Sequence, residues 1–83
     1  MSLTRDNVSN VVHQVISEIL PSVKRPQMTS RRHLKELGAD SIDRVEIISL
    51  VIDRLGVTQP MSAFSDLPDI GSLIDFLWMV TQP

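Results

Sequence analysis

The sequence predicts an all-α fold, a bundle of three longer helices and one short helix that encloses a small core. Apolar residues recur at helical spacing in three separate stretches, and a residue that can cap a helix precedes each of them. The 83 residues suffice for one small domain, and the hydrophobic fraction of 42% is typical of a folded core. We expect a single free-standing domain over residues 1–83, because nothing resembling a linker flanks it.

The first helix is expected over about residues 4–20. Thr4 is a plausible N-cap with Asp6 in the first turn, and Pro21 stops the helix. One apolar face follows from the spacing of Val8, Val11, Val12, Val15, Ile16, Ile19 and Leu20.

A long loop is expected over residues 21–39, which contain Pro21, Pro26 and Gly38. We predict a short turn from Arg31 to Leu37, with Leu34 and Leu37 pinning the loop to the core. Loops of this length are uncommon in compact domains unless they serve a function.

The second helix should begin at Ser41, after the N-cap Asp40, and run to about Leu55 before Gly56. Its core face is predicted from the positions of Val45, Ile48, Ile52 and Leu55, flanked by Val51. Ile42, Ile47 and Leu50 then lie away from the core centre. They are either covered by loops or available to a partner protein.

A short third helix is predicted around Phe64, with Ser62 as its cap, Phe64 buried and Pro68 at its end. Asp69 should cap the last helix, whose apolar face is predicted from Ile70, Leu73, Ile74, Leu77 and Trp78. We interpret Trp78 as a packing anchor, with contact to a partner as the alternative.

The composition excludes several classes of function. The net charge is −2, and the basic stretch 24–35 has no interleaved aromatic residues, which argues against nucleic-acid binding. There is no cysteine, and no run approaches the roughly 18 apolar residues that span a bilayer. The N-terminus has no basic region leading into an apolar segment. We therefore expect a soluble, cytoplasmic, monomeric protein with no membrane partner.

Ser41, His33 and a nearby acid are the residue types of a hydrolase triad, but the chain has no nucleophile elbow and is too short for an evident substrate pocket. His13 and His33 are 20 residues apart with no cysteine to join them, so we expect no metal site. Asp40 and Asp43 are better interpreted as cap and docking charge than as an acid and base pair.

The stretch Gly38-Ala39-Asp40-Ser41-Ile42 resembles the phosphopantetheine attachment motif of acyl and peptidyl carrier proteins, usually written Gly-x-Asp-Ser-Leu. The acid-then-apolar pattern typical of the family follows at Asp43, Val45, Glu46 and Ile47. The chain length, the helix and the preceding loop extend the resemblance to nearly the whole chain.

The resemblance implies a four-helix acyl carrier fold with a long loop between its first two helices. It further implies that a phosphopantetheinyl transferase attaches 4'-phosphopantetheine to Ser41. The thiol of this prosthetic group then carries acyl groups as thioesters. Such a carrier has no catalytic activity of its own. By the same resemblance the second helix docks on partner enzymes through Ile42, Ile47 and Leu50, rimmed by Asp43, Glu46 and Asp53.

The subtype follows from departures from the acid-rich fatty-acid carriers. The helix ends in Val51-Ile52-Asp53-Arg54 rather than in a run of acids, and Arg44 adds positive charge near Ser41. The chain is more similar to discrete polyketide carriers, whose partners are acyltransferases and ketosynthases. Within these it is similar to donor carriers that serve an HMG-CoA-synthase-like enzyme in β-branching. The alternatives are a fatty-acid carrier, a D-alanyl carrier, or an unmodified helical interaction domain.

Overall fold

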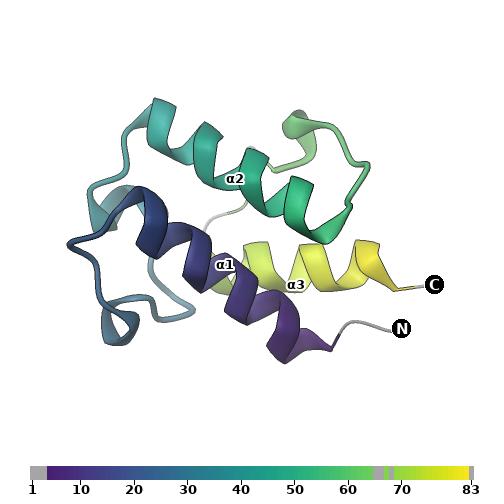
Figure 1. Ribbon diagram of the computed structural model, residues 1–83, viewed down its shortest axis with the longest axis horizontal. Coiled ribbons are helices and arrows are strands. Elements are labelled where there is room, and N and C mark those ends of the chain that lie inside the picture. The colour runs from purple at the N-terminus through teal and green to yellow at the C-terminus, as the bar shows by residue number, and fades with distance from the viewer. Residues whose placement is uncertain (1–3, 65–66, 68, 83) are drawn as a thin grey trace.

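The computed structural model describes residues 4–64, 67 and 69–82. Three α-helices, α1 (Arg5–Ile19), α2 (Ser41–Leu55) and α3 (Ile70–Thr81), form the bundle, with no strand among the described residues (Figure 1). Helices α2 and α3 run in the same direction, opposite to α1 (Figure 1). The predicted all-α fold is therefore confirmed.

Each α-helix begins at the predicted cap. Thr4 Oγ1 accepts a hydrogen bond from the Asn7 N–H at 3.1 Å, and Asp40 and Asp69 cap α2 and α3 in the same way. At the other end of α2, Gly56 takes a φ of 66°, a left-handed conformation that suits glycine. The boundaries of α1 and α2 lie within one residue of those predicted.

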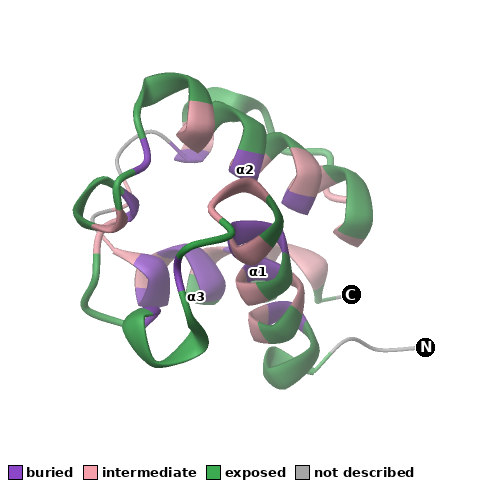
Figure 2. Cartoon of the chain, turned by 60° about the vertical axis from the view of Figure 1, so that its left-hand side comes forward, coloured by how far each residue is buried: buried purple, intermediate pink, exposed green. Residues whose placement is uncertain are grey.

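Helix α1 supplies the centre of the core and packs against both α2 and α3. Figure 2 shows buried residues on all three helices, on the sides where they face one another. The side chains that are entirely buried on α1 are those of Val8, Val12, Val15 and Ile16.

The predicted core face of α2 is wrong. Ile47 and Val51 are its buried residues, at 0% and 1% exposure, whereas Val45 is 55% exposed and Ile48 is only half-buried. This helix carries apolar residues around most of its circumference, so their spacing does not select one face. The position of α1 decides which side is buried, and Ile47 is therefore a core residue.

The long loop is tied to the bundle by its own short helices and by α3. It contains two 3-10 helices, η1 (Arg25–Gln27) and η2 (Leu34–Leu37), and the second lies within the predicted turn. Leu34 is buried and Leu37 half-buried, which confirms that both pin the loop to the core. The N–H groups of Ile70 and Gly71 bond to loop carbonyls of Arg32 and Ser30, both at 2.9 Å.

The predicted short helix is a single 3-10 turn, η3 (Met61–Phe64). It begins before Ser62, so Ser62 is not its cap, but Phe64 is buried as predicted. The Phe64 ring packs edge-on against Phe76, with centroids 5.1 Å apart. The predicted end at Pro68 lies outside the described residues.

The prediction that Trp78 anchors the core is wrong. Its side chain is 39% exposed, while the neighbouring Leu77 is entirely buried. Successive residues of a helix point about 100° apart, so the face centred on Leu73, Ile74 and Leu77 turns Trp78 toward solvent.

Candidate functional site

Ser41 is the first residue of α2 and is exposed. The turn that presents it is fixed by a reciprocal pair of bonds. Asp40 Oδ1 accepts from the Asp43 N–H at 2.8 Å, and Asp43 Oδ2 accepts from the Asp40 N–H at 3.4 Å. This pair holds the hydroxyl of Ser41 on a rigid helix start.

The approach to Ser41 needs small residues. Gly38 has a φ of 95°, and its N–H bonds to the Lys35 carbonyl at 3.1 Å. Ala39 is 3% exposed, and its N–H bonds to the Leu34 carbonyl at 3.2 Å. The chain thus turns at Gly38 and passes through the edge of the core at Ala39 before it reaches Ser41.

Arg44 lies one helical turn beyond Ser41. Its Nη2 donates a hydrogen bond to Ser41 Oγ at 3.3 Å. The side chain is half-buried, and within the described part of the chain it forms no ion pair with a carboxylate. A guanidinium that is not paired with any described carboxylate therefore adjoins the candidate attachment oxygen.

Ser41 and Arg44 lie at the edge of a cleft of about 430 Å³ between α2, α3 and the two 3-10 turns η2 and η3. Its walls include the apolar side chains of Leu34, Val45, Ile48, Met61, Phe64, Leu67 and Leu73. Its volume lies in the range of small-molecule sites. This cleft could not be predicted from the sequence, because its walls come from four separate elements.

Polar groups at the cleft have capping roles in the fold. His33 Nδ1 accepts from the Lys35 N–H at 3.0 Å and so caps η2. Asp69 Oδ1 accepts from the Ser72 N–H at 2.7 Å, which lowers the pKa of the Asp69 carboxyl, with a smaller contribution from His33. No hydrogen bond joins His33 to Ser41 among the described residues, so a hydrolase triad is not formed.

The predicted docking residues divide between surface and core. Ile42 is 69% exposed, Glu46 and Asp53 are exposed, and Asp43 and Leu50 are half-buried. Ile47 is entirely buried, so its prediction as a docking residue is wrong. The residue that the sequence interpretation missed is Val45, whose exposed side chain lines a shallow depression on α2 with Glu46, Ser49 and Leu50.

The sequence matches the phosphopantetheine attachment site family over residues 10–77. The chain belongs to this family. Its members are carrier proteins without catalytic activity, and the prosthetic group that they bear is 4'-phosphopantetheine. Such a carrier works with a phosphopantetheinyl transferase and with biosynthetic enzymes.

Two acyl carriers are similar along most of the chain. A polyketide biosynthesis acyl-carrier-protein of Bacillus subtilis, AcpK, is 33% identical over 80 residues, which cover 96% of this chain and 98% of that protein. The mitochondrial acyl carrier protein of Saccharomyces cerevisiae is 28% identical over 80 residues, covering 92% of this chain and 64% of that protein. No solved structure matches the chain. None of the described helices is long and apolar enough to cross a membrane.

Proposed function

We propose that this acyl carrier bears its phosphopantetheine on Ser41 and serves a polyketide pathway. The observation that carries the proposal is the position of Ser41, an exposed hydroxyl at the start of a capped helix and at the edge of an apolar cleft. The polyketide assignment rests on the similarity to the Bacillus carrier, which extends over nearly the full length of both chains.

The residues around Ser41 fit the prosthetic group. The phosphate would join the start of α2, where the N–H groups of the first turn and the helix dipole favour an anion. The cleft of about 430 Å³ beside Ser41 offers apolar walls to the arm or to a short acyl chain. The chain has no cysteine, so the group supplies the thiol on which acyl groups are carried as thioesters.

Attachment requires only one reacting group from this chain. Ser41 Oγ forms a bond to the phosphorus of the phosphopantetheine half of coenzyme A. The Oγ proton leaves with a base of the transferase, and the P–O bond to adenosine bisphosphate breaks. The carrier contributes the position of Oγ, which the caps of Asp40 and Asp43 hold steady.

The exposed side of α2 is proposed as the docking surface for the transferase and for pathway enzymes. Its apolar centre is formed by Ile42 and Val45, with Leu50 at its border. The acids Asp43, Glu46 and Asp53 surround this centre and favour partners with basic patches, such as acyltransferases and ketosynthases. Ile42 adjoins Ser41, so docking there brings the attachment site to the partner.

The attachment proposal is tested by intact mass after incubation with coenzyme A and a broad-specificity phosphopantetheinyl transferase. The parent should gain the mass of one phosphopantetheine, and Ser41→Ala should gain none. Ser22→Ala is the matched control and should load as the parent does, because Ser22 is an exposed serine in the loop after α1, away from the proposed docking surface. A parent that stays unmodified with an active transferase would reject the carrier role and favour an unmodified interaction domain.

A finer proposal concerns the pathway. We propose that the loaded protein supplies acetyl units, directly or from malonyl, to an HMG-CoA-synthase-like enzyme in β-branching. The Asp40-Ser41-Ile42 sequence and the weakly acidic second helix resemble discrete polyketide carriers, and among these a carrier of this length is similar to such donor carriers. Transfer from the acetyl-loaded protein to such an enzyme is the test. Absence of transfer, with transfer from a known donor carrier in parallel, would reject it.

A further inference from the structure

Among the described residues, Arg44 has no anionic partner, although the sequence around it is acidic. Asp40 and Asp43 precede it on the same turn, yet both carboxylates are engaged in the reciprocal cap of α2. Arg44 instead donates to the neutral hydroxyl oxygen of Ser41, at 3.3 Å. Hydrogen bonds from arginine to a carboxylate or phosphate are typically about 2.7–2.9 Å long, which is shorter than this contact.

Phosphopantetheine on Ser41 would place an anion next to this guanidinium. Its phosphorus is one covalent bond from Oγ, and the two non-bridging oxygens, which share one negative charge, are one bond further. Because Arg44 Nη2 already touches Oγ, the charged oxygens fall within its reach without a change of the backbone.

We propose that Arg44 is a positioning residue that binds the phosphodiester on Ser41 and holds the start of the arm at the cleft. This inference rests on the proposed attachment at Ser41. Ser41 and Arg44 both line the cleft. An ion pair between Arg44 and the phosphate on Ser41 therefore directs the arm toward the apolar walls of the cleft rather than into solvent. The pair also offsets the repulsion between the phosphate and the carboxylates of Asp40 and Asp43.

The test uses the loaded protein with a free thiol, so no acyl group or pathway enzyme enters the readout. The parent, Arg44→Gln and Arg44→Lys are loaded with excess transferase, and loading is verified by intact mass. Arg54→Gln is the matched control, because Arg54 lies at the far end of α2 and pairs with Glu18 of α1.

In the parent, the side-chain N–H resonances of Arg44 should shift on loading, while those of Arg54 stay in place. The ³¹P resonance of the phosphodiester should move in Arg44→Gln, less in Arg44→Lys, and not in Arg54→Gln. Nuclear Overhauser contacts between the arm and Leu73 or Met61 should be lost in Arg44→Gln alone.

An Arg44 side chain whose resonances are the same before and after loading of the parent would overturn the inference, even if the variants resist loading. An identical ³¹P resonance in parent and Arg44→Gln would overturn it as well. Both results leave the attachment at Ser41 intact, because the mass measurement establishes that step separately. A parent that takes up no phosphopantetheine would instead reject the proposed function on which the inference rests.

Discussion

Gly71 of α3 lies directly against Ser30 of the long loop. The Gly71 N–H donates to the Ser30 carbonyl oxygen at 2.9 Å, and a Cβ atom on Gly71 would come within 2.9 Å of Ser30 Cβ and 3.0 Å of its carbonyl oxygen. Only a residue without a side chain permits this approach. The contact fixes the loop that leads to Ser41 against the start of α3.

Gly71→Ala should therefore destabilise the fold by about 1–3 kcal/mol, because the loop backbone must move to admit a methyl group. Helix propensity alone predicts the opposite sign, since alanine favours helix over glycine by about 1 kcal/mol. Urea unfolding followed by circular dichroism measures the difference. Adding Ser30→Gly should restore only part of the loss, because the clash with the carbonyl oxygen remains. A stabilised Gly71→Ala protein would contradict the close contact.

Ile47→Ala and Ile42→Ala should have very different effects on stability. Ile47 is entirely buried between α2 and α1, so its truncation should cost about 2–5 kcal/mol. Ile42 is 69% exposed, and its truncation should change the free energy of unfolding by less than about 0.5 kcal/mol. The two substitutions remove the same atoms from the same helix, so each serves as the other's control in urea unfolding. Equal losses would mean that α2 is rotated from the orientation described.

These two isoleucines also show how far the sequence predicts this fold. Helix limits follow from local chemistry, and the caps Thr4, Asp40 and Asp69 all lie where the sequence places them. The rotation of α2 does not follow from local chemistry, because that helix is apolar on more than one side. Packing against α1 selects Ile47 and leaves Val45 exposed.

The site was predictable to the same extent. The motif at Ser41 and its capping acids can be recognised from adjacent residues, because the whole turn is contiguous in sequence. The cleft cannot be recognised in this way, since Leu34, Phe64 and Leu73 reach it from separate elements that meet only in the folded chain. The contact of Arg44 with Ser41 follows from the spacing of a helical turn. That Arg44 forms no ion pair with a described carboxylate can be seen only in the structure.

His13 should make the fold less stable as the pH falls. Burial, together with the positive charge of Arg25, lowers the pKa of His13 in the folded protein below its ordinary value of 6.5. Its Nδ1 is buried without a hydrogen-bond partner among the described residues. At pH 8 His13 is neutral in both states. As the pH falls through 6.5 the unfolded chain takes up the proton first, so the free energy of unfolding decreases toward the lower folded pKa.

Urea unfolding of the parent and of His13→Gln between pH 8 and pH 5 measures this effect. The stability of the parent should fall over this range by more than that of the variant. A parallel decline in both proteins would assign the pH dependence to other groups.

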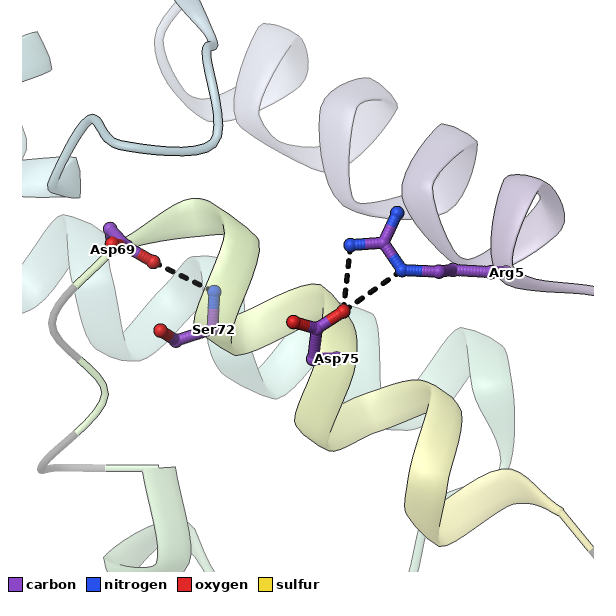
Figure 3. A network of polar contacts seen from close by, with 4 residues as sticks. All are labelled: Arg5, Asp69, Ser72 and Asp75. Atoms are coloured by element: carbon purple, nitrogen blue, oxygen red, sulfur yellow. Dashed lines mark hydrogen bonds and ion pairs between the residues drawn. The ribbon is translucent and has the colours of Figure 1, made fainter.

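Asp69 should contribute to stability at neutral pH and lose this contribution in acid. The Ser72 N–H, donating to Asp69 Oδ1, lowers the pKa of the folded carboxyl below its ordinary value of 3.8 (Figure 3). The stabilisation is therefore complete above pH 3.8 and is lost as the pH falls through the folded pKa. Asp69→Asn retains a capping oxygen but has no charge to titrate, whereas Asp69→Ala loses both.

Thermal unfolding at pH 7 and below pH 4 separates these variants. Asp69→Ala should have a lower Tm than Asp69→Asn at pH 7, and both should show a weaker acid dependence than the parent. Asp75→Asn is the control, because Asp75 is exposed on the same helix and pairs with Arg5 of α1 rather than with the helix start (Figure 3). If the Tm of Asp69→Asn fell in acid by as much as that of the parent, titration of Asp69 would not be the cause of the acid dependence.

Ile42→Ala should impair recognition by the phosphopantetheinyl transferase without unfolding the carrier. Burying an isoleucine side chain in an interface removes apolar surface from water, which stabilises the complex by about 0.8 kcal/mol for each CH₂ group buried. Truncation at the centre of the proposed docking surface should thus lower kcat/KM for loading about 10-fold, with Val45→Ala somewhat less affected. Thr58→Ala is the control, because Thr58 is exposed beyond the end of α2 and should load at the parent rate. Loading by Ile42→Ala at that same rate would move the docking surface away from this side of α2.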